Sequence, residues 1–121
     1  MANPNLTHLH PTEQQALAEF VELLQERFKE LVHLVFLFGS KARGDYDPTS
    51  DIDVLVVVDS NDWRLHKQIR YLAADISLKY DLDLSPRIWS VSHLREMEEM
   101  EASLYQNIRR DGISLLEREW G

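Results

Sequence analysis

The chain contains no cysteine among its 121 residues. Disulfide bonds and zinc sites built on thiolates are therefore excluded, and an intracellular location is the default expectation. The sequence also lacks any apolar stretch approaching the roughly 20 residues that a membrane-spanning helix needs. Its first five residues, Met-Ala-Asn-Pro-Asn, have neither the charged nor the apolar region of a signal peptide. We therefore expect a cytoplasmic protein without a membrane partner.

Basic residues are scarce. Lysine and arginine total 13, against 21 aspartate and glutamate residues, which gives a net charge of −8. Proteins that follow a nucleic-acid backbone usually concentrate basic side chains, so this balance argues against nucleic acid as a partner. The acidity agrees with a soluble protein, and also with an enzyme that contacts a nucleotide through a cation.

Length and composition indicate one domain spanning residues 1–121. The chain is 44% hydrophobic and 28% charged, which is typical of a globular protein with its own core. No internal repeat, low-complexity tract or linker marks a second domain. Residues 1–11 are expected to form a loosely held tail.

Hydrophobic periodicity and turn residues predict alternating helices and strands. A capping box of Thr12 and Gln15 predicts the first helix start. The inner face of the second helix is predicted to carry Trp63, His66, Ile69, Leu72, Ala73, Ile76 and Tyr80. In chain order we expect a helix from 12 to about 30, strands at about 32–38 and 51–58, a helix from Ser60, Asn61 or Asp62 to about 79, a strand at about 82–89, a short helix from about Ser92, a helix ending near Asp111-Gly112, and a strand at 113–116.

This order predicts an α/β fold, a two-layer sheet covered by helices. Residues 45–50 have the composition of a polar turn. Pro86 lies inside the third predicted strand and cannot donate a backbone hydrogen bond, which indicates an edge position or an irregularity there.

Two short motifs at strand ends carry the functional signal. The apolar segment 31–38 runs into Gly39-Ser40, and Asp51-Ile52-Asp53 opens the apolar run 54–58. Because side chains alternate along a strand, Asp51 and Asp53 point to the same side. Two carboxylates so close repel each other, and a hard divalent cation such as Mg²⁺ relieves that repulsion. The Gly-Ser turn adds backbone N–H groups that can receive phosphate oxygens. Together the motifs predict a metal–nucleotide site.

The combination resembles the nucleotidyltransferase superfamily of the polymerase-beta type, and within it the minimal nucleotidyltransferases. The family pattern reads here as Phe38-Gly39-Ser40-Lys41-Ala42-Arg43-Gly44, a linker at 45–50, and Asp51-Ile52-Asp53-Val54. The resemblance is strong over about residues 31–89. It implies the nucleotidyltransferase fold, α/β in the broad sense that includes α+β, with a mixed sheet.

The resemblance also implies a mechanism of nucleotidyl transfer with two Mg²⁺ ions, in which Asp51 and Asp53 bind metal. A third carboxylate on a neighbouring strand should bind the metal near the acceptor and help to deprotonate it. Asp83 is the candidate, and Asp81, with the same strand parity, is the alternative. Each of these aspartates could instead be a solvated strand-end residue.

The same resemblance assigns the phosphates of the nucleotide to the Gly-Ser turn. Gly39 and Ser40 are expected to hold them through backbone N–H groups and the hydroxyl, although a simple strand-to-helix turn would use the same residues. Lys41 and Arg43 follow within one helical turn and could supply positive charge to the triphosphate. Arg43 is the favoured one of the two, with pairing to a local aspartate as its alternative.

The expected function is Mg²⁺-dependent transfer of AMP from ATP to a hydroxyl acceptor. Many minimal nucleotidyltransferases are encoded beside a small helical partner of the HEPN type, and some neutralise that toxin by adding AMP to it, as the antitoxin of a type VII toxin–antitoxin system. The resemblance thus implies a HEPN-type protein partner. Two alternatives are a catalytically weak module that sequesters a partner, and an adenylyltransferase acting on a small molecule. A neighbouring HEPN-like reading frame would favour the first function.

Overall fold

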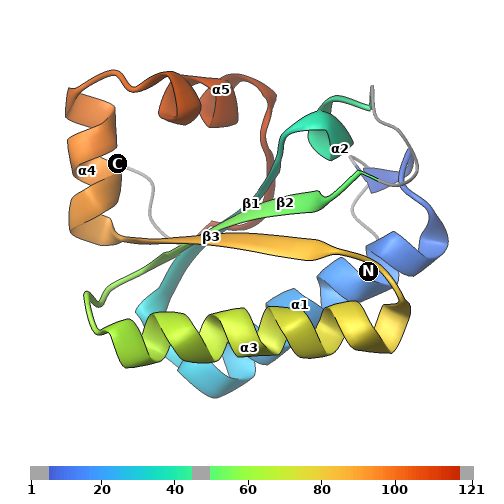
Figure 1. Ribbon diagram of the computed structural model, residues 1–121. Helices are drawn as coiled ribbons and strands as arrows, with labels where there is room; N and C mark the ends of the chain where they lie inside the picture. Colours follow the sequence, from blue (N-terminus) through green and yellow to red (C-terminus); the bar gives the residue numbers. More distant parts are fainter. Residues whose placement is uncertain (1–5, 45–49, 118–121) are drawn as a thin grey trace.

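A mixed four-stranded sheet with helices on both faces organises the chain (Figure 1). The computed structural model describes residues 6–44 and 50–117. The strand order is β3-β2-β1-β4, in which β1 is antiparallel to both β2 and β4 and β2 is parallel to β3. The bounds are β1 Val32–Phe38, β2 Ile52–Val58, β3 Leu84–Ser90 and β4 Ile113–Glu117. The expected mixed sheet is confirmed, and β3, which contains Pro86, lies at its edge.

Two long helices, α1 (Pro11–Phe28) and α3 (Trp63–Tyr80), cover one face of the sheet. The residues that pack together there include Phe20 and Leu24 of α1 and Ile69 and Ile76 of α3, all buried. The even-numbered residues of β2, Ile52 to Val58, point toward this layer. Among the described residues, no helix is long and apolar enough to cross a membrane.

The shorter helices α4 (Val91–Glu99) and α5 (Ser103–Asp111) lie on the opposite face. A second group of buried residues joins them to the sheet: Leu34, Phe36, Leu55, Val57, Trp89 and Ile108. Because strand side chains alternate, odd-numbered residues of β2 belong to this face. The position of Asp53 on the α4/α5 side therefore follows from the same alternation that buries Leu55.

Helix α1 begins differently from the prediction. Its N-cap is His10, whose ring Nδ1 accepts a hydrogen bond from Thr12 N at 3.2 Å, while His10 N donates to Glu13 Oε1 at 2.9 Å. Pro11 occupies the first helical position, where its missing N–H costs nothing. The predicted capping box of Thr12 and Gln15 was wrong because this earlier cap starts the helix at Pro11. Helix α3 begins as predicted, with Asp62 as its N-cap.

The segment before α1 also differs from the expected loose tail. Leu6 and Leu9 are only 6% and 3% exposed and pack into the core on the α1/α3 side. His8 Nε2 lies 2.6 Å from Lys41 O, within hydrogen-bond distance. Residues 6–10 are therefore ordered by the burial of two leucines, and the tail prediction was wrong for them.

Smaller differences concern the inner face of α3 and the short elements. Trp63, in the first turn of α3, is 63% exposed, so the predicted inner stripe is wrong at this residue. The stripe is confirmed at the buried Ile69, Leu72, Ala73 and Ile76 and at Tyr80, which packs against the core. A 3₁₀ turn, Lys29–Leu31, joins α1 to β1, and a single helical turn, α2 (Ser40–Arg43), follows β1. The predicted turn at 45–49 lies outside the described residues.

Candidate active site

Asp51 and Asp53 lie at the start of β2. Asp51 precedes the strand and is exposed, whereas Asp53 is its second residue and is partly buried. Asp53 pairs with Phe38 at the end of β1 and with Ser85 on β3. The antiparallel pairing of β1 with β2 therefore brings the Gly39-Ser40 turn to the strand end that carries the two aspartates.

Gly39 brings the backbone close to the Asp53 carboxylate. Its φ of 76° lies in the region that favours glycine, and a Cβ added to it would lie 2.7 Å from Asp53 Oδ2. Both facts require glycine at this position. The turn after β1 is thus shaped around the Asp53 carboxylate.

Helix α2 starts directly at this turn. The N–H groups of Ala42 and Arg43 donate to Gly39 O at 3.1 and 3.2 Å, so helical hydrogen bonding begins at Ala42. Ser40 is the first residue of α2, and the N–H groups of the first turn of a helix have no acceptor within the helix. This arrangement offers donors to an anion next to the carboxylate pair.

Asp83, the residue before β3, lies in the same corner. Its carbonyl oxygen accepts a hydrogen bond from Ile52 N at 2.8 Å, which fixes the approach to β3 beside the start of β2. A hydrogen bond with the Asp51 carboxyl group and repulsion from its charge raise the pKa of Asp83. The pKa of Asp53 is also raised, by burial first and then by the charge of Asp51, with a smaller contribution from Asp83. The three carboxyl groups therefore act on one another.

The chemistry of this cluster fits a divalent cation. Carboxylate oxygens are the ligands that Mg²⁺ prefers. The carboxylates repel one another, and a bound cation would relieve that repulsion. Within residues 6–44 and 50–117, no three Asp, Glu or His side chains already converge on a single point as a preformed metal site would require. Asp51 and Asp83 raise the charge density of this corner together, and a bound cation would offset it.

Asp81, the alternative third carboxylate, lies elsewhere. It ends α3 in the left-handed conformation, with φ and ψ both at 53°. It lines a separate cavity of about 570 Å³ together with Glu13, Lys41 and Tyr80. The strand begins only at Leu84, so Asp81 is not part of an extended segment with Asp83 and need not point to the same side. The structure therefore brings Asp83, and not Asp81, to Asp51 and Asp53.

Lys41 differs from the expected triphosphate contact. Its side chain is 1% exposed, and its ammonium Nζ lies 2.6 Å from Glu13 Oε2. Two contacts hold Lys41 near the start of α1. Its ammonium group binds Glu13, and its backbone carbonyl oxygen lies within hydrogen-bond distance of His8. We correct the expectation for Lys41 to a buried ion pair that fastens α2 to α1.

Arg43 is exposed and turns toward α5. Hydrogen bonding with Arg110 lowers the pKa of Asp111, and the charge of Arg43 lowers it further, which places that charge near the end of α5. Pairing with a local aspartate was the alternative left open for Arg43, and residues 45–49, which include the aspartates nearest in sequence, lie outside the described residues. Asp111 is not local, since it lies 68 residues away along the chain.

Sequence reasoning missed two arginines beside the cluster. Arg87 on β3 and Arg70 on α3 line a cleft of about 450 Å³ together with Asp53. The charge of Arg87 partly offsets the rise in the pKa of Asp53. Strand alternation could have placed Arg87 on the face of Asp83, since both are odd-numbered in one extended segment. No sequence signal indicates that Arg70 reaches this face.

Comparisons with known proteins agree with this geometry. Residues 17–114 match the nucleotidyltransferase domain family. A protein of Methanocaldococcus jannaschii named "Putative protein adenylyltransferase MJ0141" is 42% identical over 76 residues, which are 62% of this chain and 77% of that protein.

Two solved structures share the fold. A toxin–antitoxin crystal structure with AMP-PNP has a TM-score of 0.59 at 22% identity, covering 85% of this chain and 74% of that chain. The toxin–antitoxin MntA-HepT has a TM-score of 0.54 at 21% identity, covering 87% and 73%. At this identity the likeness concerns the fold alone. The family match spans most of the chain and includes the Gly39 turn and the three carboxylates, and the chain therefore belongs to the nucleotidyltransferase domain family as an enzyme of that family.

Proposed function

We propose that this nucleotidyltransferase moves AMP from ATP to a hydroxyl group on a partner protein in a Mg²⁺-dependent reaction. The observation that carries the proposal is the approach of the Gly39 backbone to Asp53, in the same corner as Asp51 and Asp83. A phosphate-binding turn and a carboxylate cluster are placed where one magnesium nucleotide can meet both.

Three aspartates would hold the metal. Asp51, Asp53 and Asp83 supply the hard oxygen donors, and two Mg²⁺ ions bound there would stabilise negative charge on the reacting phosphate. The backbone N–H groups at Gly39 and Ser40, with the Ser40 hydroxyl, are assigned to the phosphate oxygens. For Arg43 we propose only an electrostatic contribution at the phosphates, because its positive charge also acts on Asp111.

The transfer step follows from these positions. The acceptor oxygen attacks the α-phosphorus, the bond from that phosphorus to the bridging oxygen breaks, and pyrophosphate leaves. The acceptor proton moves to the Asp83 carboxylate, which stands at the β3 side of the cluster.

A toxin partner is the acceptor we favour. The fold neighbours are toxin–antitoxin structures, one of them with a nucleotide analogue, and the related M. jannaschii protein bears the name of a protein adenylyltransferase. We propose that the acceptor hydroxyl belongs to a small helical protein of the HEPN type. On this proposal the chain acts as an antitoxin that neutralises its partner by modification.

Magnesium and ATP together should raise the melting temperature, while either alone should do little. The carboxylates need the cation, and the triphosphate needs the same cation to approach them. At a nucleotide concentration one hundred times its Kd, binding should add about 2.7 kcal/mol to the free energy of unfolding. Thermal scans with MgATP, MgGTP, ATP plus EDTA, and Mg²⁺ alone measure this. No shift with either magnesium nucleotide at millimolar concentration would contradict the proposal.

The third carboxylate has its own test. Asp83→Asn should still bind MgATP but fail to transfer AMP, because the amide cannot accept the acceptor proton. Asp81→Asn should keep most of the activity, since Asp81 faces a different cavity. Transfer of labelled AMP and the thermal shift are measured in parallel for both variants. Loss of activity in Asp81→Asn alone would move the base to that residue.

A further inference from the structure

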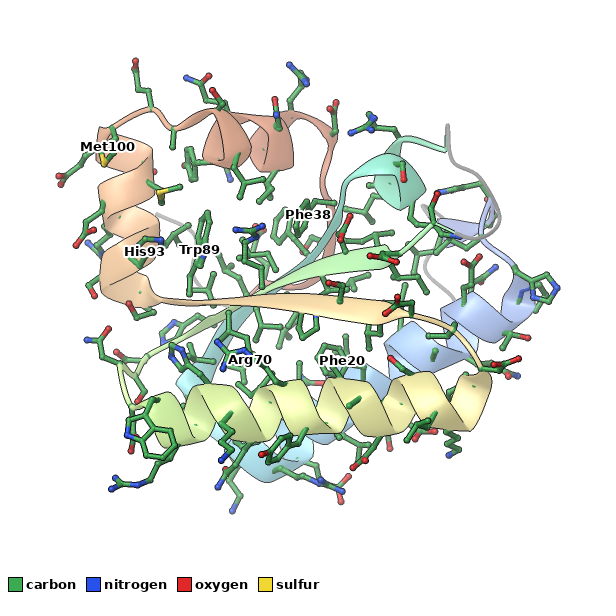
Figure 2. All side chains as sticks on the ribbon, in the orientation of Figure 1. Phe20, Phe38, Arg70, Trp89, His93 and Met100 are labelled. Carbon is green, nitrogen blue, oxygen red and sulfur yellow. The ribbon has the colours of Figure 1, made fainter. Side chains whose placement is uncertain are left out.

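The cleft beside Asp53 runs along the edge strand β3 and takes residues from both sides of the sheet. Arg70 comes from α3 on one side, whereas Arg87 and Trp89 belong to the α4/α5 face. The floor of the cleft is formed by consecutive residues of β3, and Phe38 and Trp89 line it as aromatic residues. Figure 2 shows both aromatic side chains on the α4/α5 face, and Arg70 extending from α3 toward β3. The cleft has a volume of about 450 Å³ and is open to solvent beside the edge strand.

Its charge is unusual for this protein. The chain has a net charge of −8, yet Arg70 and Arg87 both line this one cleft, and both are exposed. Two consecutive elements, α3 and β3, supply these guanidinium groups. They present several hydrogen-bond donors, which suit a carboxylate or phosphate group.

The cleft lies on the acceptor side of the cluster. The Gly39-Ser40 turn, assigned to the phosphates, follows β1, whereas Asp83 and Arg87 belong to β3 and its approach, and β2 with Asp53 separates the two. A nucleotide held by the turn therefore leaves the β3 side open. Asp83 precedes β3, and the cleft with Arg87 follows it along the same strand beside Asp53.

We infer that the cleft formed by Arg70, Arg87, Phe38 and Trp89 is the acceptor subsite, and that it accepts a peptide segment carrying a carboxylate close to the modified hydroxyl. The inference rests on the proposed function. Asp53 pairs with Ser85, and Arg87 lies two residues further along β3, or about 7 Å at the usual rise of a strand. An extended peptide covers that distance in about two residues, so the acidic side chain should lie within two positions of the acceptor.

Three peptides with one tyrosine acceptor test this specificity. They carry glutamate, glutamine or lysine at the two positions on either side, and AMP transfer is measured by mass spectrometry with the full-length enzyme and MgATP. We expect the glutamate peptide to have the highest kcat/KM. Arg70→Glu and Arg87→Gln should each lower that value by about tenfold or more, as expected when a hydrogen bond between charged groups is lost.

Matched variants separate specificity from general charge effects. Arg64→Glu changes the same charge on the same helix, but Arg64 lies against Trp63 and is absent from the residues that line the cleft, so peptide preference should not change. Arg70→Lys should keep the preference for glutamate. The MgATP thermal shift should be the same in Arg64→Glu, Arg70→Lys and Arg70→Glu, whereas Arg87 lies close enough to Asp53 for its charge to act on that carboxylate.

Each other outcome is decisive. Equal kcat/KM for the three peptides, or no transfer to any of them by an enzyme that MgATP stabilises, would overturn the acidic-peptide subsite and leave the nucleotide site standing. A weaker MgATP shift in Arg70→Glu would assign the cleft to the triphosphate instead. Absence of any MgATP shift in the unaltered protein would instead contradict the proposed function itself.

Discussion

Asp53→Asn should reduce AMP transfer by at least about a thousandfold, the loss typical when preorganised electrostatic stabilisation is removed. Asp53 is the carboxylate that the backbone of Gly39 approaches and that responds to both Asp51 and Asp83. An amide of the same shape keeps one oxygen but loses the charge that attracts a divalent cation. The MgATP thermal shift should fall together with activity.

The same substitution should leave the metal-free protein equally stable or more stable at neutral pH. Burial and repulsion from Asp51 raise the pKa of Asp53 above its value in the unfolded chain. The folded state then binds more protons than the unfolded state between these two pKa values, so stability falls as pH rises through that interval. Asparagine removes this penalty. The gain should therefore be present above the raised pKa and disappear below about pH 3.9, where Asp53 is protonated in both states.

Urea unfolding in EDTA, over a series of pH values, measures the stability difference. Asp59→Asn is the matched control, because Asp59 is an exposed aspartate just beyond the other end of β2. It should leave the activity unchanged. A soluble but strongly destabilised Asp53→Asn protein would show that the carboxylate is structural.

The relative placement of the aspartates and the Gly39-Ser40 turn could be predicted from the sequence, because side-chain alternation and strand ends follow simple rules. Alternation put Asp51 and Asp53 on one side, and both motifs lay at strand ends, where antiparallel pairing of β1 and β2 brings them together. The positive φ of Gly39 explains why glycine occupies this position. Its close approach to Asp53 depends on the tertiary structure and could not be read from the sequence. Choosing between Asp81 and Asp83 needed the position where α3 ends and β3 begins, and element boundaries are the least certain part of a sequence prediction.

Charged side chains were harder to place than apolar ones. Lys41 was expected at the triphosphate because its position follows the Gly-Ser turn, yet its partner Glu13 lies 28 residues earlier in a separate helix. Local patterning gives no information about a pair so distant. Leu6 and Leu9 were missed for a related reason, since two leucines between polar residues show no helical or strand period.

Glu13→Gln should lower the free energy of unfolding by about 3–5 kcal/mol, the usual cost of removing one partner from a buried ion pair. The Lys41 ammonium is 1% exposed and has the Glu13 carboxylate at 2.6 Å. Glu13 uses both oxygens, Oε2 for Lys41 and Oε1 for the N–H of His10. Glutamine has only one oxygen, so one of these donors would face an NH₂ group.

Glu19→Gln is the matched control on the same helix. Glu19 accepts from Lys79 and Tyr80 through one oxygen, Oε1, and Lys79 is 59% exposed. Water can replace this partner, and glutamine keeps the accepting oxygen, so the loss should be far smaller. Equal losses in the two variants would show that the buried pair has no special weight.

The pair should also matter for nucleotide binding, because Lys41 belongs to α2, whose first residue follows Gly39. Loosening the link to α1 should make the MgATP thermal shift smaller in Glu13→Gln than in the unaltered protein. Neither Glu13 nor Lys41 contacts the nucleotide in our proposal. The double variant Glu13→Gln with Lys41→Met removes the buried charge together with its partner and should recover most of the stability. Recovery of stability without recovery of the MgATP shift would show that the ion pair positions α2. Recovery of both would show that burial of an uncompensated charge accounts for the whole effect.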